Sequence, residues 1–179
     1  QSNRPTIERR LRQEADCRFV VKSNPRPSEG EEIIIYNQDN AKLFAGIIDE
    51  VHDMELGQGI HILYSCKARD YTYQLNRKLV VETYENQSAD VIVRDILTKY
   101  APNFNDAFVE SDAPVVEWIT FDYKMPSECF QELCDYVGWY WYVDYDKAVH
   151  FFNPQDLPKP APMIIQPGGD FRNFRRSID

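Results

Sequence analysis

The 179-residue sequence lacks a long apolar run, and its mean hydropathy is −0.54. A helix that crosses a membrane needs about 20 predominantly apolar residues in succession, and no stretch approaches that length. The first residues also lack the basic, apolar and small-residue regions of a secretory signal peptide. The sequence therefore predicts no membrane-spanning segment.

Positive charge is the second shortage. The chain has 20 Lys and Arg against 29 Asp and Glu, a formal net charge of −9. This balance argues against specific nucleic-acid binding and against an anionic lipid surface, both of which require a cationic face. The charge is also uneven, since residues 1–30 carry +3 and residues 158–179 carry +2, whereas residues 31–70 carry −5 and residues 101–157 carry −9. Basic ends around an acidic middle favour contacts with neighbours of opposite sign, including copies of the same chain, although a solvated acidic face gives the same pattern.

Motifs for metal, cofactor or nucleophile chemistry are missing as well. The four cysteines form no C-x-x-C pair, and the three histidines lie far apart in the sequence, so we predict reduced thiols and neither a metal site nor a cofactor. No G-x-S-x-G, P-loop or H-E-x-x-H motif occurs, and we predict no catalytic residue and no enzyme activity. Asp144 and Asp146 could be imagined as a glycosidase pair, but their spacing is that of turn residues.

The first half of the chain shows strand signals separated by turns. We predict strands at residues 17–22, 32–36, 42–51 and 60–68, with a turn at 54–59 and with Gly46 marking a bulge or a close approach between strands. Short strands at this spacing predict an antiparallel sheet that curls into a barrel.

The second half alternates helices and strands. Apolar positions at helical spacing predict helices over residues 89–100, with Ser88 as N-cap, and 126–137, ended by Gly138. Residues 103–114 are predicted as a loop, 115–123 as an extended strand, and 139–143 and 148–152 as a hairpin. The fold class is thus α+β: a β-barrel domain (1–85), a helix–strand–helix–hairpin domain (86–153), and a proline-rich linker with the start of an incomplete further barrel (154–179). We therefore expect the chain to be part of a longer protein.

Two sets of side chains are candidates for binding. The arginines near the two ends suit interfaces because of their planar guanidinium groups; they are Arg9, Arg10, Arg12, Arg172, Arg175 and Arg176. Trp139 and Trp141, in a chain that is 13% aromatic, would form a sugar-binding platform if exposed. The favoured interpretation is that a neighbouring helix and a partner domain cover this hairpin.

Six segments carry a further signal through their order and spacing. They are LFAGIIDE (43–50), YSCKARDY (64–71), LNRKLV (75–80), ADVIVRDIL (89–97), ELCDYVGWYWYVD (132–144) and DFRNFRR (170–176). Together they resemble the first barrel, the intervening domain and the start of the second barrel of phage tail hub proteins, found at the baseplate or tail tip.

The resemblance implies a structural role. Such hubs form a ring, usually a trimer, that joins the tail tube to a spike or fibres, and related hubs occur in contractile injection systems. The expected partners are copies of the chain itself, tail tube or distal tail proteins, and spike or fibre proteins. The expected location is the virion tail tip, after synthesis in the bacterial cytoplasm. The alternatives left open are a carbohydrate-binding module for host-surface recognition and a component of a cell-wall hydrolase.

Overall fold

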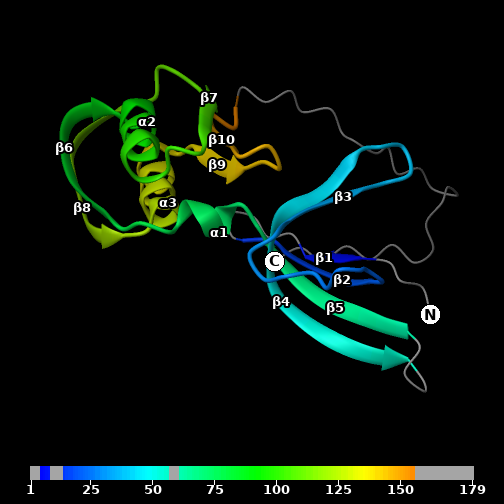
Figure 1. Ribbon diagram of the computed structural model, residues 1–179. Helices are drawn as coiled ribbons and strands as arrows, with labels where there is room; N and C mark the ends of the chain where they lie inside the picture. Colours follow the sequence, from blue (N-terminus) through cyan, green and yellow to red (C-terminus); the bar gives the residue numbers. More distant parts are fainter. Residues whose placement is uncertain (1–4, 9–13, 57–60, 156–179) are drawn as a thin grey trace, which may run out of the picture.

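The computed structural model describes residues 5–8, 14–56 and 61–155 (Figure 1). Its first part is one sheet of five strands, which we call the curled sheet. All neighbouring strands are antiparallel, and their order is β1-β2-β5-β4-β3. The strands are β1 (Thr6–Glu8), β2 (Asp16–Val21), β3 (Glu32–Tyr36), β4 (Lys42–Leu56) and β5 (His61–Asp70).

The predicted antiparallel, curling sheet is confirmed, and within the described residues it is a half-barrel. Its two edge strands, β1 and β3, do not pair with each other in that part of the chain. The strand predicted for residues 42–51 is longer than expected, because its ladder with β5 continues to the pair Leu56 and His61. This extension replaces the first half of the predicted turn at 54–59.

Gly46 shows why β4 and β5 can lie so close where the sheet bends. A Cβ atom on Gly46 would lie 2.0 Å from the backbone oxygen of Arg69, and no side chain tolerates that distance. The predicted close approach at Gly46 is therefore confirmed. The register of the same pair of strands shifts between Ile48 and Glu50, which adds a bulge two residues further on.

The remaining elements form what we call the α/β unit, residues 80–155. A two-stranded antiparallel ribbon, β6-β8, and a three-stranded sheet, β7-β10-β9, flank two helices (Figure 1). One turn of helix, α1 (Thr72–Leu75), links the curled sheet to this unit. The elements of the α/β unit are β6 (Val80–Ser88), α2 (Ala89–Tyr100), β7 (Asn105–Val109), β8 (Val115–Lys124), α3 (Pro126–Val137), β9 (Tyr140–Val143) and β10 (Ala148–Phe152).

Both helices have the bounds predicted from their apolar periodicity. Gly138 ends α3 in the left-handed conformation, with φ of 75°, as predicted. Ser88 occupies the N-cap position of α2, but its side chain makes no capping hydrogen bond. Instead, the Ala89 amide donates to the backbone oxygen of Pro114, so the loop before β8 satisfies this helix end.

The loop predicted for residues 103–114 contains a strand, β7. Four of its five residues are exposed, so it lacks the alternation that identifies a strand from sequence. It forms because β10, more than 40 residues later, pairs with it in parallel, with Phe108 opposite His150.

The predicted domain division at residues 85 and 86 stays a prediction. The whole of β6 pairs with β8, from Val80 opposite Lys124 to Ser88 opposite Val115. We therefore propose a boundary before Val80, which assigns residues 80–85 to the second domain rather than the first. The predicted linker and further barrel, residues 154–179, lie outside the described residues from position 156 onward.

Candidate interaction surfaces

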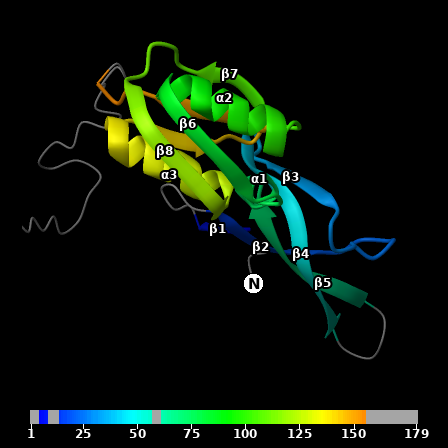
Figure 2. The same ribbon diagram turned by 90° about the vertical axis from the view of Figure 1, so that its left-hand side faces the viewer.

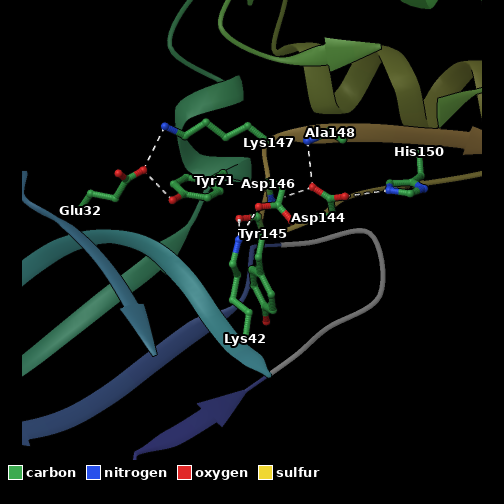
Figure 3. Close-up of polar contacts among 9 residues, drawn as sticks. All are labelled: Glu32, Lys42, Tyr71, Asp144, Tyr145, Asp146, Lys147, Ala148 and His150. Carbon is green, nitrogen blue, oxygen red and sulfur yellow. Dashed lines mark hydrogen bonds and ion pairs between the residues drawn. The ribbon is translucent and has the colours of Figure 1, made fainter. Parts of the chain in front are cut away.

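The turn between β9 and β10 reaches across to the curled sheet (Figure 3). One carboxylate oxygen of Asp144, Oδ1, accepts hydrogen bonds from the amides of Asp146, at 2.8 Å, and Ala148, at 2.9 Å. The predicted turn role is thus confirmed for Asp144, which fixes the backbone of the loop. The pKa of Asp144 is lowered: burial acts to raise it, but hydrogen bonds from His150 and these two amides outweigh burial.

One side of this turn binds β4. Lys42 Nζ donates to the backbone oxygen of Tyr145, at 3.1 Å, and pairs with the carboxylate of Asp146. The Tyr145 ring lies 5.7 Å from the ring of Phe44, which is fully buried in the curled sheet. Asp146, the second residue of the imagined glycosidase pair, is therefore engaged in holding two parts of the fold together.

The other side of the turn binds β3 and α1. Lys147 Nζ lies 3.1 Å from Glu32 Oε1 and 4.6 Å from the centre of the Tyr71 ring, and the Tyr71 hydroxyl donates to the same Glu32 oxygen at 2.6 Å. The hydrogen bonds from Tyr71 and Lys147 lower the pKa of Glu32. Burial and the bond to Glu32 raise the pKa of Tyr71, so this phenol stays a donor. We call these contacts on both sides of the turn the junction. Its residues are Glu32, Lys42, Phe44, Tyr71, Tyr145, Asp146 and Lys147.

A buried carboxyl group anchors the start of the α/β connection. Asp70, 8% exposed at the end of β5, accepts the amides of Ala15 and Thr72, each at 3.0 Å. Burial raises the pKa of Asp70 to about 6, although both hydrogen bonds act in the opposite direction. This carboxyl ties the segment before β2 to the beginning of α1, which is a structural role.

The predicted aromatic platform is wrong for the two tryptophans. Trp139, just before β9, is 7% exposed because its ring packs on β10, and Trp141, in β9, is 2% exposed because its ring packs on α3. Trp141 packs edge-on against Phe130 at 5.5 Å, and Trp139 lies 5.2 Å from Phe151. The favoured alternative, burial of this side of the hairpin, is the one observed.

Other aromatic rings occupy the outer side of the same sheet. His150 is stacked between Tyr142, at 4.3 Å, and Phe108, at 4.5 Å, with interplanar angles of 8° and 12°. Its Nε2 atom lies 3.0 Å from Asp144 Oδ2, which links the stack to the junction turn. The imidazole has a ring on each side, so it has no open face for a sugar. This stack is not predictable from the sequence, because Phe108 lies in the segment expected to be a loop.

The six interface arginines predicted from sequence cannot be placed against these surfaces. Arg9, Arg10 and Arg12, and likewise Arg172, Arg175 and Arg176, all lie outside the described residues. Their interface role stays a prediction.

The four cysteines, Cys17, Cys66, Cys129 and Cys134, are buried and reduced, as predicted. Burial raises the pKa of Cys17 to about 11 and that of Cys129 to about 12, which disfavours the reactive thiolate. Among residues 5–8, 14–56 and 61–155, no three His, Cys, Asp or Glu side chains are grouped to hold a metal ion. No helix in this part of the chain is long and apolar enough to span a membrane.

Comparison with solved structures defines the class of fold. The chain has the fold of phage tail proteins and of a type VI secretion component, so the resemblance seen in the sequence is confirmed at the level of the fold. The match to the 43 kDa tail protein of prophage MuSo2 from Shewanella oneidensis has a TM-score of 0.62 at 13% identity, over 79% of this chain and 47% of that one. The match to a tail protein of Neisseria meningitidis MC58 has a TM-score of 0.62 at 14% identity, over 82% and 44%.

A third match extends the class beyond phages. The Escherichia coli c3393 protein, a type VI secretion component described as structurally similar to the T4 tail proteins gp27 and gp5, matches with a TM-score of 0.55 at 16% identity, over 77% of this chain and 40% of that one. The chain thus spans less than half the length of each of these proteins. No protein-family model matches the chain, and no curated protein matches it.

Proposed function

We propose that the protein is a structural, non-enzymatic subunit of a phage tail-tip or baseplate hub. In this role, three copies form a ring that joins the tail tube to a spike or to fibres. The observation that carries the proposal is the fold, which is shared with tail proteins from two bacterial genomes and a type VI secretion component over about four-fifths of the chain. The partners are further copies of the chain, tail tube or distal tail proteins, and spike or fibre proteins, and the location is the tail tip of the virion.

The mechanism in this proposal is geometric. A ring needs surfaces that bind the next subunit and an inner wall that does not bind what passes through it. The acidic segments, residues 31–70 and 101–157, would suit that wall, because negative charge repels the phosphates of passing DNA. The junction supports the same role, since it ties the curled sheet to the α/β unit through the side chains of three successive turn residues, Tyr145, Asp146 and Lys147.

The carbohydrate-binding alternative required exposed rings of Trp139 and Trp141, and both rings are buried. In the outer aromatic stack, the imidazole of His150 cannot stack on a sugar, because the rings of Phe108 and Tyr142 cover both of its faces. We therefore develop only the assembly role.

The proposal is tested by the mass and shape of the protein in solution. Light scattering should give the mass of three subunits, and negative-stain images should show rings with a central opening. Gold-labelled antibody should bind purified tails only at the end remote from the head. A strict monomer at every concentration, or label along the whole tube, would refute the hub role.

A further inference from the structure

The outward side of the β6-β8 ribbon is not covered by any other element in the described part of the chain, residues 5–8, 14–56 and 61–155. The cross-strand pairs Val81–Asp122, Thr83–Thr120 and Glu85–Trp118 place six side chains on it, and all six are exposed. We call these six residues the ribbon face. Figure 2 shows the ribbon lying over the outside of α2 and α3. Trp118 is 61% exposed at one end of the face and Val81 is 49% exposed at the other.

An exposed tryptophan on a sheet face is a typical anchor of a protein interface. Tryptophan is enriched among the residues that contribute most to binding at protein interfaces. A bulge ends the face, where Tyr123, with φ of 51° and 71% exposed, interrupts the register between β6 and β8. Such a bulge opposes edge-to-edge strand pairing, so the partner is expected on the face itself.

The charge of the ribbon face selects the kind of partner. Its charged members are Glu85 and Asp122, and none of its six residues is basic. Two copies that packed ribbon face on ribbon face would bring four carboxylates together, which is unfavourable. The partner surface should therefore carry cations, and an arginine or lysine above the Trp118 ring would add a cation–π contact.

The curled sheet supplies such a surface on its outer side. Arg18 in β2 lies opposite Lys67 in β5, and Ser65 lies opposite His52 in β4. A hollow of about 310 Å³ is lined by these residues with Glu50 and Cys66. We call Arg18, Val20, Glu50, His52, Ser65 and Lys67 the outer face.

The outer face carries two cations, and Arg18 is the one that is available to a partner without breaking an ion pair. Arg18 is exposed and forms no ion pair with any residue in the described part of the chain. Lys67 Nζ lies 3.5 Å from Glu50 Oε1, and the other oxygen of Glu50, Oε2, lies 3.5 Å from His52 Nε2, so Glu50 is shared between two neighbours. Val20, beside Arg18, gives the outer face an apolar position that can contact a ring.

We propose that the ribbon face of one subunit packs on the outer face of the curled sheet in the next subunit. Trp118 anchors the contact, and Arg18 and Lys67 pair with Glu85 and Asp122. The two faces belong to opposite ends of the molecule, as Figure 1 shows, so the contact is head-to-tail and can close into a ring. This inference rests on the proposed hub function, because it names the surfaces through which that ring would form.

The first test changes the anchor. In the full 179-residue chain, Trp118→Lys should raise the Kd of self-association about tenfold or more, measured by sedimentation velocity over a concentration series. Tyr136→Lys is the matched control: it alters another exposed aromatic residue, 57% exposed on α3 and outside both faces, and should leave association unchanged. Val81→Lys provides a second variant of the ribbon face, and circular dichroism identifies any variant that fails to fold.

The second test exchanges charges between the two faces. Glu85→Lys with Asp122→Lys, and separately Arg18→Glu with Lys67→Glu, should each weaken self-association. Mixing the two double variants should restore association between them, because the exchanged charges again attract. Association of Trp118→Lys and Val81→Lys equal to that of the wild type, or mixed variants that stay apart, would overturn this pairing of faces.

These outcomes separate the inference from the proposed function. Rings that form in the wild type and persist in both ribbon-face variants would refute the named surfaces and leave the hub role intact. A wild-type chain that remains a monomer would remove both the ring and the contact proposed for it.

Discussion

The two parts of the chain bury their apolar side chains in different ways. The α/β unit and the adjoining Leu75 share one continuous core of 22 buried residues, contributed by both helices and both of its sheets. Within the described residues, the curled sheet has three separate clusters, of four, four and three buried residues. A closed layer structure can be stable by itself, whereas a half-barrel with small clusters depends on what packs against it.

The junction is one of the supports of the curled sheet. Partly buried Tyr145, from the turn of the α/β unit, packs against two of the three clusters, and Val143 and Phe104 pack against one of them. The smaller part of the core is thus completed by side chains from the larger part. This difference predicts which part can fold alone.

The largest expected effect is the loss of folding in one of two fragments. A fragment of residues 72–155 retains the whole 22-residue core and should unfold cooperatively in urea. A fragment of residues 5–71 loses Phe104, Val143 and Tyr145 and should show no cooperative transition. Circular dichroism measures both. Cooperative unfolding of the second fragment would show that the curled sheet is independent and would remove the contrast.

A single substitution in the continuous core should have the next largest effect. Trp141→Ala removes a ring that is 2% exposed and packed on Phe130, at a cost of about 3–5 kcal/mol in the free energy of unfolding. Tyr142→Ala, the neighbouring position on the outer side, removes a 44% exposed ring and should cost about 1 kcal/mol through the lost stack on His150.

Urea titrations measure the two losses directly. Comparable losses for Trp141→Ala and Tyr142→Ala would mean that the outer stack is as important to the α/β unit as its core. That result would indicate that another part of the protein covers the stack.

Elements whose signals are local are predictable from the sequence. The stripes of α2 and α3 repeat at helical spacing, and Gly138 and the Asp144 turn are specified by single residues that suit one backbone conformation. These features depend on neighbours in the chain, so the sequence predicts them directly.

Features that depend on distant pairing were missed. β7 has no alternation of its own and becomes a strand only beside β10, and β6 joins the α/β unit only because it pairs with β8. The sides of the hairpin were also ambiguous, since Trp141 and Tyr142 are both aromatic and only the position of α3 decides which one is buried. The junction was invisible for the same reason, because Glu32 and Lys147 are more than 100 residues apart.

The third prediction concerns the carboxyl group at the end of the curled sheet. The pKa of Asp70 in the folded protein, about 6, lies above the value of about 3.9 in an unfolded chain. The protonated carboxyl therefore adds stability that is fully present below pH 4 and is lost as the pH rises through 6. Asp70→Asn keeps the shape of the side chain and cannot ionise.

Urea titrations at several pH values isolate this group, because the other carboxylates are common to both proteins. The wild type should lose about 2–3 kcal/mol relative to Asp70→Asn between pH 4 and pH 7. A difference that does not change over this range would show that Asp70 is not desolvated, and that the end of β5 is more open to water than its 8% exposure indicates.

The smallest expected effect is at the junction, and it tests whether the two parts are coupled. Glu32 accepts hydrogen bonds from Tyr71 and Lys147, which lower its pKa. The side chain of Glu32 is 49% exposed, so water screens its ion pair with Lys147. Glu32→Gln should therefore lower the free energy of unfolding by only about 0.5–1 kcal/mol at pH 7. A lowered pKa in the fold means stability that is present above the unfolded value and lost as the pH falls through the folded value, so the cost should be smaller at about pH 3 than at pH 7. Thermal unfolding of Glu32→Gln, with Glu29→Gln as the control at an exposed carboxylate in the loop before β3, measures this cost at both pH values.

Because all three tryptophans lie in the α/β unit, their fluorescence should follow the unfolding of that unit with an unchanged midpoint, while circular dichroism records the earlier loss of the curled sheet. Equal shifts in both signals would mean that the two parts unfold together and that the α/β unit depends on the curled sheet as much as the reverse.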